Sequence, residues 1–422
     1  MKKILLSMMI LVSSYALSYT FPIKDPYTAT IVGSSTMMTA GISEEVPTKN
    51  YKVKIKEEIP QIFWYDREFE FSLTAQKDEA PLIFVLAGTG SDYKATRMKY
   101  LERIFYDAGF SVISISSPMS AQFLISASKE GAPGLLMNDN KDTYEAMKLA
   151  YEKVKDKIKV NEFLLAGYSL GATNSAVISY IDERENYFNF KRVFMINPAV
   201  ELYSSAKKLD RYLDDYTGGD SNKIEALIEN VLTRMKNNMK NEYSNINAET
   251  IFSLVGGEFL SEAEKKAFIG LAFRLTSVDL NFISDIITKS YIYTDKDENL
   301  DKYSSLFKYF QKVDFANFES YVDKIGYPYY KNKYPNFTMK DLNDEASLRI
   351  IEDYLKASDK IVAVTNADEL ILSETDLNYL KEVFKNRIKV YPYGGHCGNM
   401  YYHENVATML TFLKSGVFNS EK

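Results

Sequence analysis

Histidine and cysteine are the scarcest reactive residues in this chain of 422 amino acids. There are two histidines and a single cysteine, Cys397. A single cysteine excludes a disulfide within the chain. The sequence also has no HExxH or CxxC spacing of the kind that binds zinc. We therefore expect an enzyme or binding protein that has no disulfide framework, no metal and no cofactor.

The chain also lacks a strong charge of either sign. It has 51 Lys and Arg against 57 Asp and Glu, which gives a formal net charge of −6. No basic patch with interleaved aromatic residues is present, so we expect no nucleic-acid partner. Hydrophobic residues make up 46% of the chain, which excludes disorder as the main state. The length is sufficient for a large core and an insertion.

Apolar runs long enough to cross a bilayer, about 20 residues, are missing as well. The run 4–12 follows Lys2 and Lys3 and leads into small residues that end at Ser18. A basic end, a short apolar centre and small residues before a cut are typical of a signal peptide. We predict a signal peptide over 1–18, export to the periplasm or the extracellular space, and no stable membrane span after cleavage. A membrane anchor is the alternative.

The most informative motif that is present is Gly167-Tyr168-Ser169-Leu170-Gly171. It follows an apolar run, 160–166, and precedes an expected helix, 170–182. In this strand–turn–helix context a sharp turn lifts the serine hydroxyl clear of the backbone. Glycines on both sides remove side chains that would collide in the bend. The pattern predicts Ser169 as a nucleophile, and the alternative is a glycine-rich turn with an incidental serine.

Two residues further along the chain can complete a catalytic group with this serine. His396 stands in a glycine-rich loop after an expected strand, 387–391, and Asp368 follows the apolar run 361–366. Loops held by a rigid scaffold are where catalytic groups gather. The second histidine, His403, opens an expected helix, where an exposed or capping role is the ordinary expectation.

With these residues in the order serine, acid, histidine, the chain resembles the α/β-hydrolase superfamily. The resemblance covers about 51–412, interrupted by one large insertion. It implies that Ser169 is the nucleophile, that His396 is general base and then acid, and that Asp368 orients the imidazole. Some members of the superfamily place the acid earlier, so Glu201 is the alternative, and Glu369 and Asp376 are further candidates.

The resemblance also indicates where an oxyanion hole would lie. A buried strand pattern over 81–86 runs into Ala87-Gly88-Thr89-Gly90. The family often has His-Gly at this turn, and this chain has Ala-Gly instead. We expect the backbone N–H groups of Thr89 and Leu170 to be the donors. The alternative is a plain glycine turn that joins a strand to a helix.

Cys397 is the other nucleophile to consider, because it adjoins His396. Residues adjacent in sequence rarely hold a thiol and an imidazole in the geometry of a reactive pair, and Ser169 already fills that role. We expect Cys397 to pack beneath the histidine loop instead.

Alternating strand and helix patterns predict an α/β fold with a mostly parallel sheet and helices on both faces. Period-two alternation within 52–74 predicts antiparallel strands at the edge of that sheet. The βα pattern stops after the sixth expected strand, 191–197, and gives way to helical patterns. The predicted organisation is a leader of unclear structure over 19–50, a core over 51–198, a helical cap or lid over 199–345, and the rest of the core over 346–422.

The insertion is rich in aromatic residues, which line a substrate pocket or form the insertion's own core. Those we single out are Tyr203, Tyr212, Tyr216, Phe259, Phe268 and Phe273. The predicted function is an exported serine hydrolase that cleaves an ester or related acyl bond of a small-molecule acyl substrate. A peptidase or a thioesterase would use the same machinery, and a non-catalytic binding protein on this scaffold is the rival from another class. The sequence leaves the oligomeric state open.

Overall fold

The computed structural model describes residues 19–33, 41–220, 222–238 and 260–420. Within them, eight strands form one sheet in the order β1-β2-β4-β3-β5-β6-β7-β8. The first two pairings, β1 with β2 and β2 with β4, are antiparallel, and all the others are parallel. The strands are β1 (Thr48–Val53), β2 (Phe69–Thr74), β3 (Ala80–Leu86), β4 (Ser111–Ile115), β5 (Val160–Tyr168), β6 (Arg192–Ile196), β7 (Ile361–Asn366) and β8 (Ile388–Tyr391).

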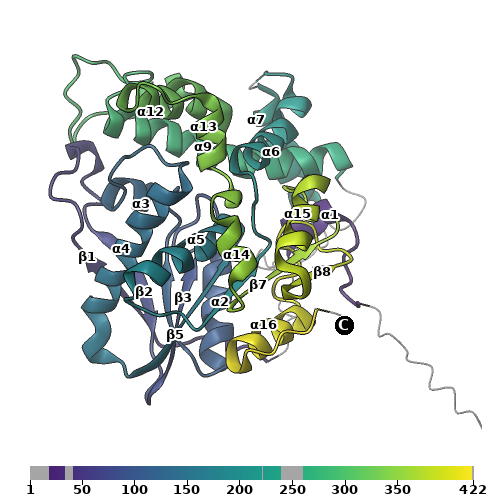
Figure 1. The fold of residues 1–422 in the computed structure, drawn as a ribbon. Coiled ribbons are helices and arrows are strands. Elements are labelled where there is room, and N and C mark those ends of the chain that lie inside the picture. The colour runs from purple at the N-terminus through teal and green to yellow at the C-terminus, as the bar shows by residue number, and fades with distance from the viewer. Residues whose placement is uncertain (1–18, 34–40, 221, 239–259, 421–422) are drawn as a thin grey trace, which may run out of the picture.

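Helices cover both faces of this sheet (Figure 1). In β3, Leu82 and Phe84 pack into one apolar core, and Ile83 and Val85 pack into another. This alternation follows from the period of two in a strand, and a strand buried on both faces reads as a continuous apolar run. One core is shared with α3 (Ala121–Ser126), α4 (Leu136–Val154), α5 (Leu170–Glu185) and α15 (Glu374–Phe384), and the other with α2 (Thr96–Asp107) and α16 (His403–Ser415).

A helical insertion separates β6 from β7 and lies at the top of the molecule in Figure 1. It was predicted to follow the sixth strand, and in the structure it does. Its helices are α6 (Leu202–Thr217), α7 (Asn222–Asn238), α9 (Glu262–Thr288), α10 (Phe307–Val313), α11 (Phe318–Tyr321), α12 (Tyr327–Lys333) and α13 (Met339–Glu345). The chain returns to the sheet through α14 (Glu352–Ala357).

The long helix α9 is the main element of the insertion. It begins with a capping box in which the Ser261 hydroxyl accepts from the backbone N–H of Glu264 and the Glu264 side chain accepts in return, as its sequence predicts. Arg274 joins it to α6 by ion pairs with Asp210 and Asp214. By length and composition α9 is the one helix in the described ranges that is apolar enough to cross a membrane, and 61% of its most apolar window is buried inside the protein.

The segment 19–50 has more structure than its composition predicts. Asp25 caps a short helix, α1 (Pro26–Val32), by accepting from the backbone N–H of Thr28, and β1 begins at Thr48. The predicted signal peptide, 1–18, and Phe259 lie outside the described residues.

Candidate active site

Ser169 lies at the turn between β5 and α5, in backbone geometry that few residues adopt. Its φ is 56° and its ψ −126°, a strained combination for a residue other than glycine. A Cβ at Gly167 would lie 2.2 Å from the carbonyl oxygen of Gly171, and a Cβ at Gly171 would lie 2.2 Å from that of Leu86. Gly167 is therefore required for the turn itself to close, and Gly171 for the turn to pack against β3. The turn presents the serine side chain to a cavity above the sheet.

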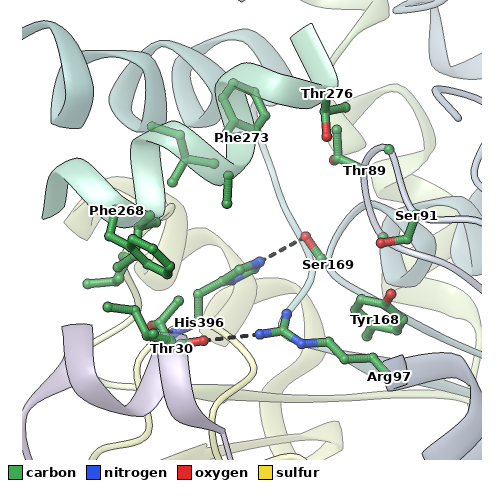
Figure 2. Close-up of a pocket in the computed structure, with 17 residues that line it drawn as sticks. Thr30, Thr89, Ser91, Arg97, Tyr168, Ser169, Phe268, Phe273, Thr276 and His396 are labelled. Carbon is green, nitrogen blue, oxygen red and sulfur yellow. Dashed lines mark hydrogen bonds between the residues drawn. The ribbon is translucent and has the colours of Figure 1, made fainter. Parts of the chain in front are cut away.

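The structure brings Ser169 and His396 together from positions 227 residues apart. The Ser169 Oγ lies 2.8 Å from Nε2 of the imidazole. His396 follows β8 in the loop that leads to α16, and Figure 2 shows its ring pointing at the serine across the cavity wall. This is the geometry in which an imidazole takes the proton of a serine hydroxyl.

The predicted acid, Asp368, does not contact the imidazole, and this part of the prediction is wrong. Glu369, the next residue, does: its Oε1 lies 2.8 Å from Nδ1 of His396. Asp368 instead accepts hydrogen bonds from the backbone N–H groups of Gly394 and Gly395, at 3.1 and 2.9 Å. The two neighbouring carboxylates thus have different partners: Glu369 binds the imidazole, and Asp368 binds the backbone of the loop that carries it.

Sequence reasoning missed the residue that holds Glu369 in place. Asn197, directly after β6, donates from Nδ2 to Oε2 of Glu369 at 2.5 Å. The other oxygen, Oε1, also accepts from the backbone N–H of Ile371. With one oxygen fixed by Asn197, the carboxylate directs the other at His396. The sequence feature that could have indicated Asn197 is a polar residue directly after the buried strand β6, which pairs with β7, the strand that leads to Glu369.

The other candidate acids are engaged elsewhere. Glu201 pairs with Arg349 at 2.8 Å and accepts from the Ser347 hydroxyl. Asp376 forms the capping box of α15 with Ser373. Neither carboxylate has a bond to His396, so Glu369 takes the acid position.

The segment after the predicted cleavage site packs against the histidine loop. The Thr30 hydroxyl in α1 accepts from the backbone N–H of His396 at 2.8 Å and donates to the carbonyl of Pro26. Cβ atoms at Gly395 and Gly398 would lie 2.2 Å from the carbonyl oxygens of Pro26 and Ala29 respectively. The loop can approach α1 this closely because both positions are glycine.

A cavity of about 390 Å³ opens above Ser169 and His396. Phe268 and Phe273, two of the insertion's predicted pocket residues, line it from α9. The others whose side chains are described lie elsewhere: Tyr203 packs on Phe318, Tyr212 on Tyr27, and Tyr216 against the insertion's own small core. The structure therefore places Phe268 and Phe273 in the pocket lining. The other three described aromatic side chains pack elsewhere.

The two residues predicted for an oxyanion hole lie beside the serine. Thr89 lines the main cavity with Ser169, and both Thr89 and Leu170 line a smaller adjoining cavity. Leu170 is the first residue of α5, so its backbone N–H has no acceptor within the helix. The insertion closes over this loop, because a Cβ at Gly90 would lie 2.2 Å from the Thr276 side chain of α9.

The charge state of His396 follows from its neighbours. Burial lowers the pKa of the imidazole, but Cys397 and Glu369 raise it by more, so the net pKa lies above the ordinary value of 6.5. Burial also raises the pKa of Asp368 above its ordinary value, although the Gly394 and Gly395 N–H groups act in the opposite direction.

The remaining histidine lies apart from the serine, whereas the cysteine lies next to the imidazole of His396. His403 is exposed at the start of α16 and stacks on Tyr402. Cys397 is 1% exposed, packs into the apolar core, and its Sγ lies 3.9 Å from Nε2 of His396. In the described ranges no cluster of His, Cys, Asp and Glu is arranged to hold a metal ion.

No protein-family model matches the sequence, and no curated protein matches it either. Solved structures align over most of the chain at low identity. A thioesterase domain from the curacin biosynthetic pathway is 10% identical, covering 87% of this chain and 99% of that one, with a TM-score of 0.37. An esterase from Rhizomucor miehei is 13% identical (88% and 85% covered, TM-score 0.42). An acylaminoacyl peptidase from Pyrococcus horikoshii is 10% identical (89% and 42% covered, TM-score 0.43).

These likenesses are distant, so the fold is assigned from the chain's own features. Those features are the strand order of the sheet, the strained serine between β5 and α5, and the serine–acid–histidine order along the chain. A serine at this kind of turn on a mostly parallel sheet, with its partners in that order, is the arrangement of one superfamily. The chain has the α/β-hydrolase fold.

Proposed function

We propose that this protein is a serine hydrolase that cleaves an ester or related acyl bond through a covalent acyl-enzyme. The observation that carries the proposal is the continuous hydrogen-bonded chain from Ser169 through His396 to Glu369, with both links at 2.8 Å. It lies at the wall of a cavity large enough for a small substrate. A serine, an imidazole and a carboxylate in this order are the parts of a catalytic triad.

In the proposed reaction, His396 takes the proton of Ser169 as the serine oxygen attacks the substrate carbonyl. The backbone N–H groups of Thr89 and Leu170 stabilise the negative charge that develops on the carbonyl oxygen. His396 then gives the proton to the leaving group, which departs as an alcohol, thiol or amine. Water, deprotonated by His396, releases the acyl group from the serine.

Glu369 has the role first assigned to Asp368. Its carboxylate accepts from Nδ1 of His396, which fixes the tautomer that leaves Nε2 free to accept the serine proton. It also stabilises the imidazolium that forms during the reaction. Burial of Glu369, whose side chain is 2% exposed, strengthens this interaction by excluding water.

The helical insertion is proposed to select the substrate. Its helix α9 lines the cavity with Phe268, Phe273 and Thr276, and ligands of open α/β sheets bind beyond the carboxyl ends of the strands.

We also propose export, on the strength of the basic and apolar pattern over 1–18 and of Tyr19. That residue, the first after the predicted cut, packs on Tyr391 and Tyr393.

The test is a screen of acyl esters, thioesters and aminoacyl amides on the mature protein, with Ser169→Ala as the control. We expect hydrolysis of at least one class, lost in the variant while its fold is unchanged. The class that is cleaved distinguishes an esterase from a thioesterase or a peptidase. Equal rates for the two proteins would contradict the proposal, and turnover of none of the classes would favour a non-catalytic binding protein.

A further inference from the structure

A cationic side chain lies in the wall of the same cavity and is not used by the triad. Arg97, the second residue of α2, lines the cavity together with Ser169 and His396. Figure 2 shows its guanidinium extending from α2 to the space below the serine–histidine pair. An arginine is charged at every pH at which proteins fold, so a positive charge stands beside the reacting atoms.

This guanidinium is only partly satisfied. It has five N–H donors, and the one hydrogen bond it makes to a described residue runs from NH2 to the carbonyl of Thr30, at 3.1 Å. No carboxylate in the described ranges pairs with it. Arg97 is partly buried, and withdrawing a charge from water without a counter-charge costs free energy, a cost that a bound anion would offset.

Other arginines of the protein show what a structural role looks like here. Arg274 is almost fully buried and binds both Asp210 and Asp214. Arg349, at the base of the insertion, binds Glu201. Each of these arginines pairs with a carboxylate of the protein itself, whereas Arg97 lines the cavity without such a partner among the described residues.

The rest of the cavity lining suits an anion as well. Among the described residues it includes no aspartate or glutamate, because Glu369 lies behind the imidazole. Hydroxyl groups of Ser91 and Thr276 are present. The Tyr168 hydroxyl is buried in the same wall, and in Figure 2 it points towards Ser91, which is its hydrogen-bonding neighbour.

Resting on the proposed function, we propose that Arg97 binds an anionic oxygen-bearing group of the substrate. The substrates are thus acyl compounds that carry a carboxylate or a phosphate within reach of the scissile bond. The planar guanidinium binds either group through two parallel N–H···O bonds. Apolar side chains of α9, among them Phe268 and Phe273, contact the uncharged part of the same substrate.

The experiment compares three p-nitrophenyl esters of equal chain length, in which the far end is a carboxylate, a phosphonate or a neutral methyl ester. Wild-type protein should have a higher kcat/KM for a charged ester than for the neutral one, and the better of the two charged esters identifies the anion. Arg97→Gln should lower the charged-to-neutral ratio by about ten- to a hundredfold, the range for loss of a hydrogen bond to a charged group. Arg97→Lys, which keeps the charge but not the planar fork, should give an intermediate ratio.

A matched control lies one turn and a half further along the same helix. Arg103 hydrogen-bonds to the carbonyls of Lys99 and Glu44 and stacks on Tyr100, outside the cavity. Arg103→Gln should keep the wild-type ratio. If Arg97 only holds α1 in place through Thr30, Arg97→Gln will lower the rates for all three esters alike, and that result overturns the proposal. A wild-type protein without preference for either charged ester overturns it too.

A binding measurement separates this proposal from that of catalysis. In Ser169→Ala protein, titration calorimetry with glutarate and with inorganic phosphate should detect binding of at least one anion. Binding should weaken at least tenfold when Arg97→Gln is added. Wild-type protein that binds one of these anions but hydrolyses none of the esters would contradict the hydrolase assignment alone. An absence of anion binding in a protein that hydrolyses neutral esters would contradict the Arg97 proposal alone.

Discussion

The Thr30 hydroxyl accepts the backbone N–H of His396 at 2.8 Å, across 366 positions of the chain. The same threonine accepts from Arg97 through its carbonyl oxygen. A short helix near the N-terminus thereby holds both the imidazole loop and the cation of the cavity. The segment that the sequence left undefined is part of the site, and Thr30 is a positioning residue for the histidine.

Thr30→Val should lower kcat by about tenfold with little change in KM. The substitution keeps the shape and leaves the His396 N–H without its acceptor, which costs about 1–3 kcal/mol when the group is buried. Steady-state kinetics of the folded variant measures the effect. Thr30→Ser, which retains the hydroxyl, should restore most of kcat; a Thr30→Val protein with the parent's kcat would exclude a positioning role.

Glu369→Gln should lower kcat by roughly a thousandfold or more, because an amide at this position favours the wrong imidazole tautomer. Asp368→Asn is the matched control, since it changes the neighbouring carboxylate in the same loop. It should retain far more activity and should instead lower the thermal stability, because Asp368 accepts two backbone N–H groups of the histidine loop. The assignment fails if the two variants exchange these phenotypes.

The pH dependence of kcat/KM should have its acid limb above pH 6.5. The raised pKa of His396 means that the imidazole stays protonated to a higher pH than usual. Only the neutral form accepts the serine proton, so activity rises as the pH increases through that pKa. In Glu369→Gln the limb should move to lower pH because the carboxylate that favours the imidazolium is gone. A wild-type limb well below 6.5 would contradict the geometry around the ring.

Gly171→Ala should destabilise the protein by about 3 kcal/mol or prevent folding, because its methyl group would meet the Leu86 backbone at 2.2 Å and neither α5 nor β3 can move without cost. Gly326→Ala is the control. There the added methyl meets only the Tyr321 ring, at 3.3 Å, within helical backbone. Thermal unfolding of both variants measures the difference; similar melting temperatures would show that the turn has more space than its packing indicates.

Phe273→Ala should change the order in which esters of different acyl length are hydrolysed. Phe273 lines both the main cavity and the smaller one that contains Leu170, so its removal lengthens the space beside Ser169. We expect longer acyl chains to gain relative to acetate. Phe310→Ala, an exposed position of the same insertion, should leave the order unchanged. An unaltered order in Phe273→Ala would place substrate selection elsewhere.

The elements of the core could be predicted because their sequences carry local signals. The buried strands are continuous apolar runs, and the serine turn has glycines at the two positions where backbone segments touch. The sequence also placed the histidine loop correctly after the last strand. These features depend on residues close together in the chain.

What could not be predicted depends on contacts between distant segments. Asp368 and Glu369 are adjacent, and only the fold determines which one faces the imidazole; Asn197, 172 residues before Glu369, decides it by binding the second carboxylate oxygen. Thr30 likewise acts across most of the chain. In the sequence Arg97 has no feature that separates it from the other charged residues of its helix, and its position in the cavity wall depends on the fold.

The most direct test of Ser169 as the nucleophile is labelling with a fluorophosphonate probe, followed by mapping of the modified peptide by mass spectrometry. We expect one phosphonyl group per molecule, on Ser169, and no labelling of Ser169→Ala. Labelling of Glu369→Gln should be far slower than that of Asp368→Asn. Intact, folded protein that fails to react, or that reacts equally well without Ser169, would contradict the central claim that this serine is an activated nucleophile.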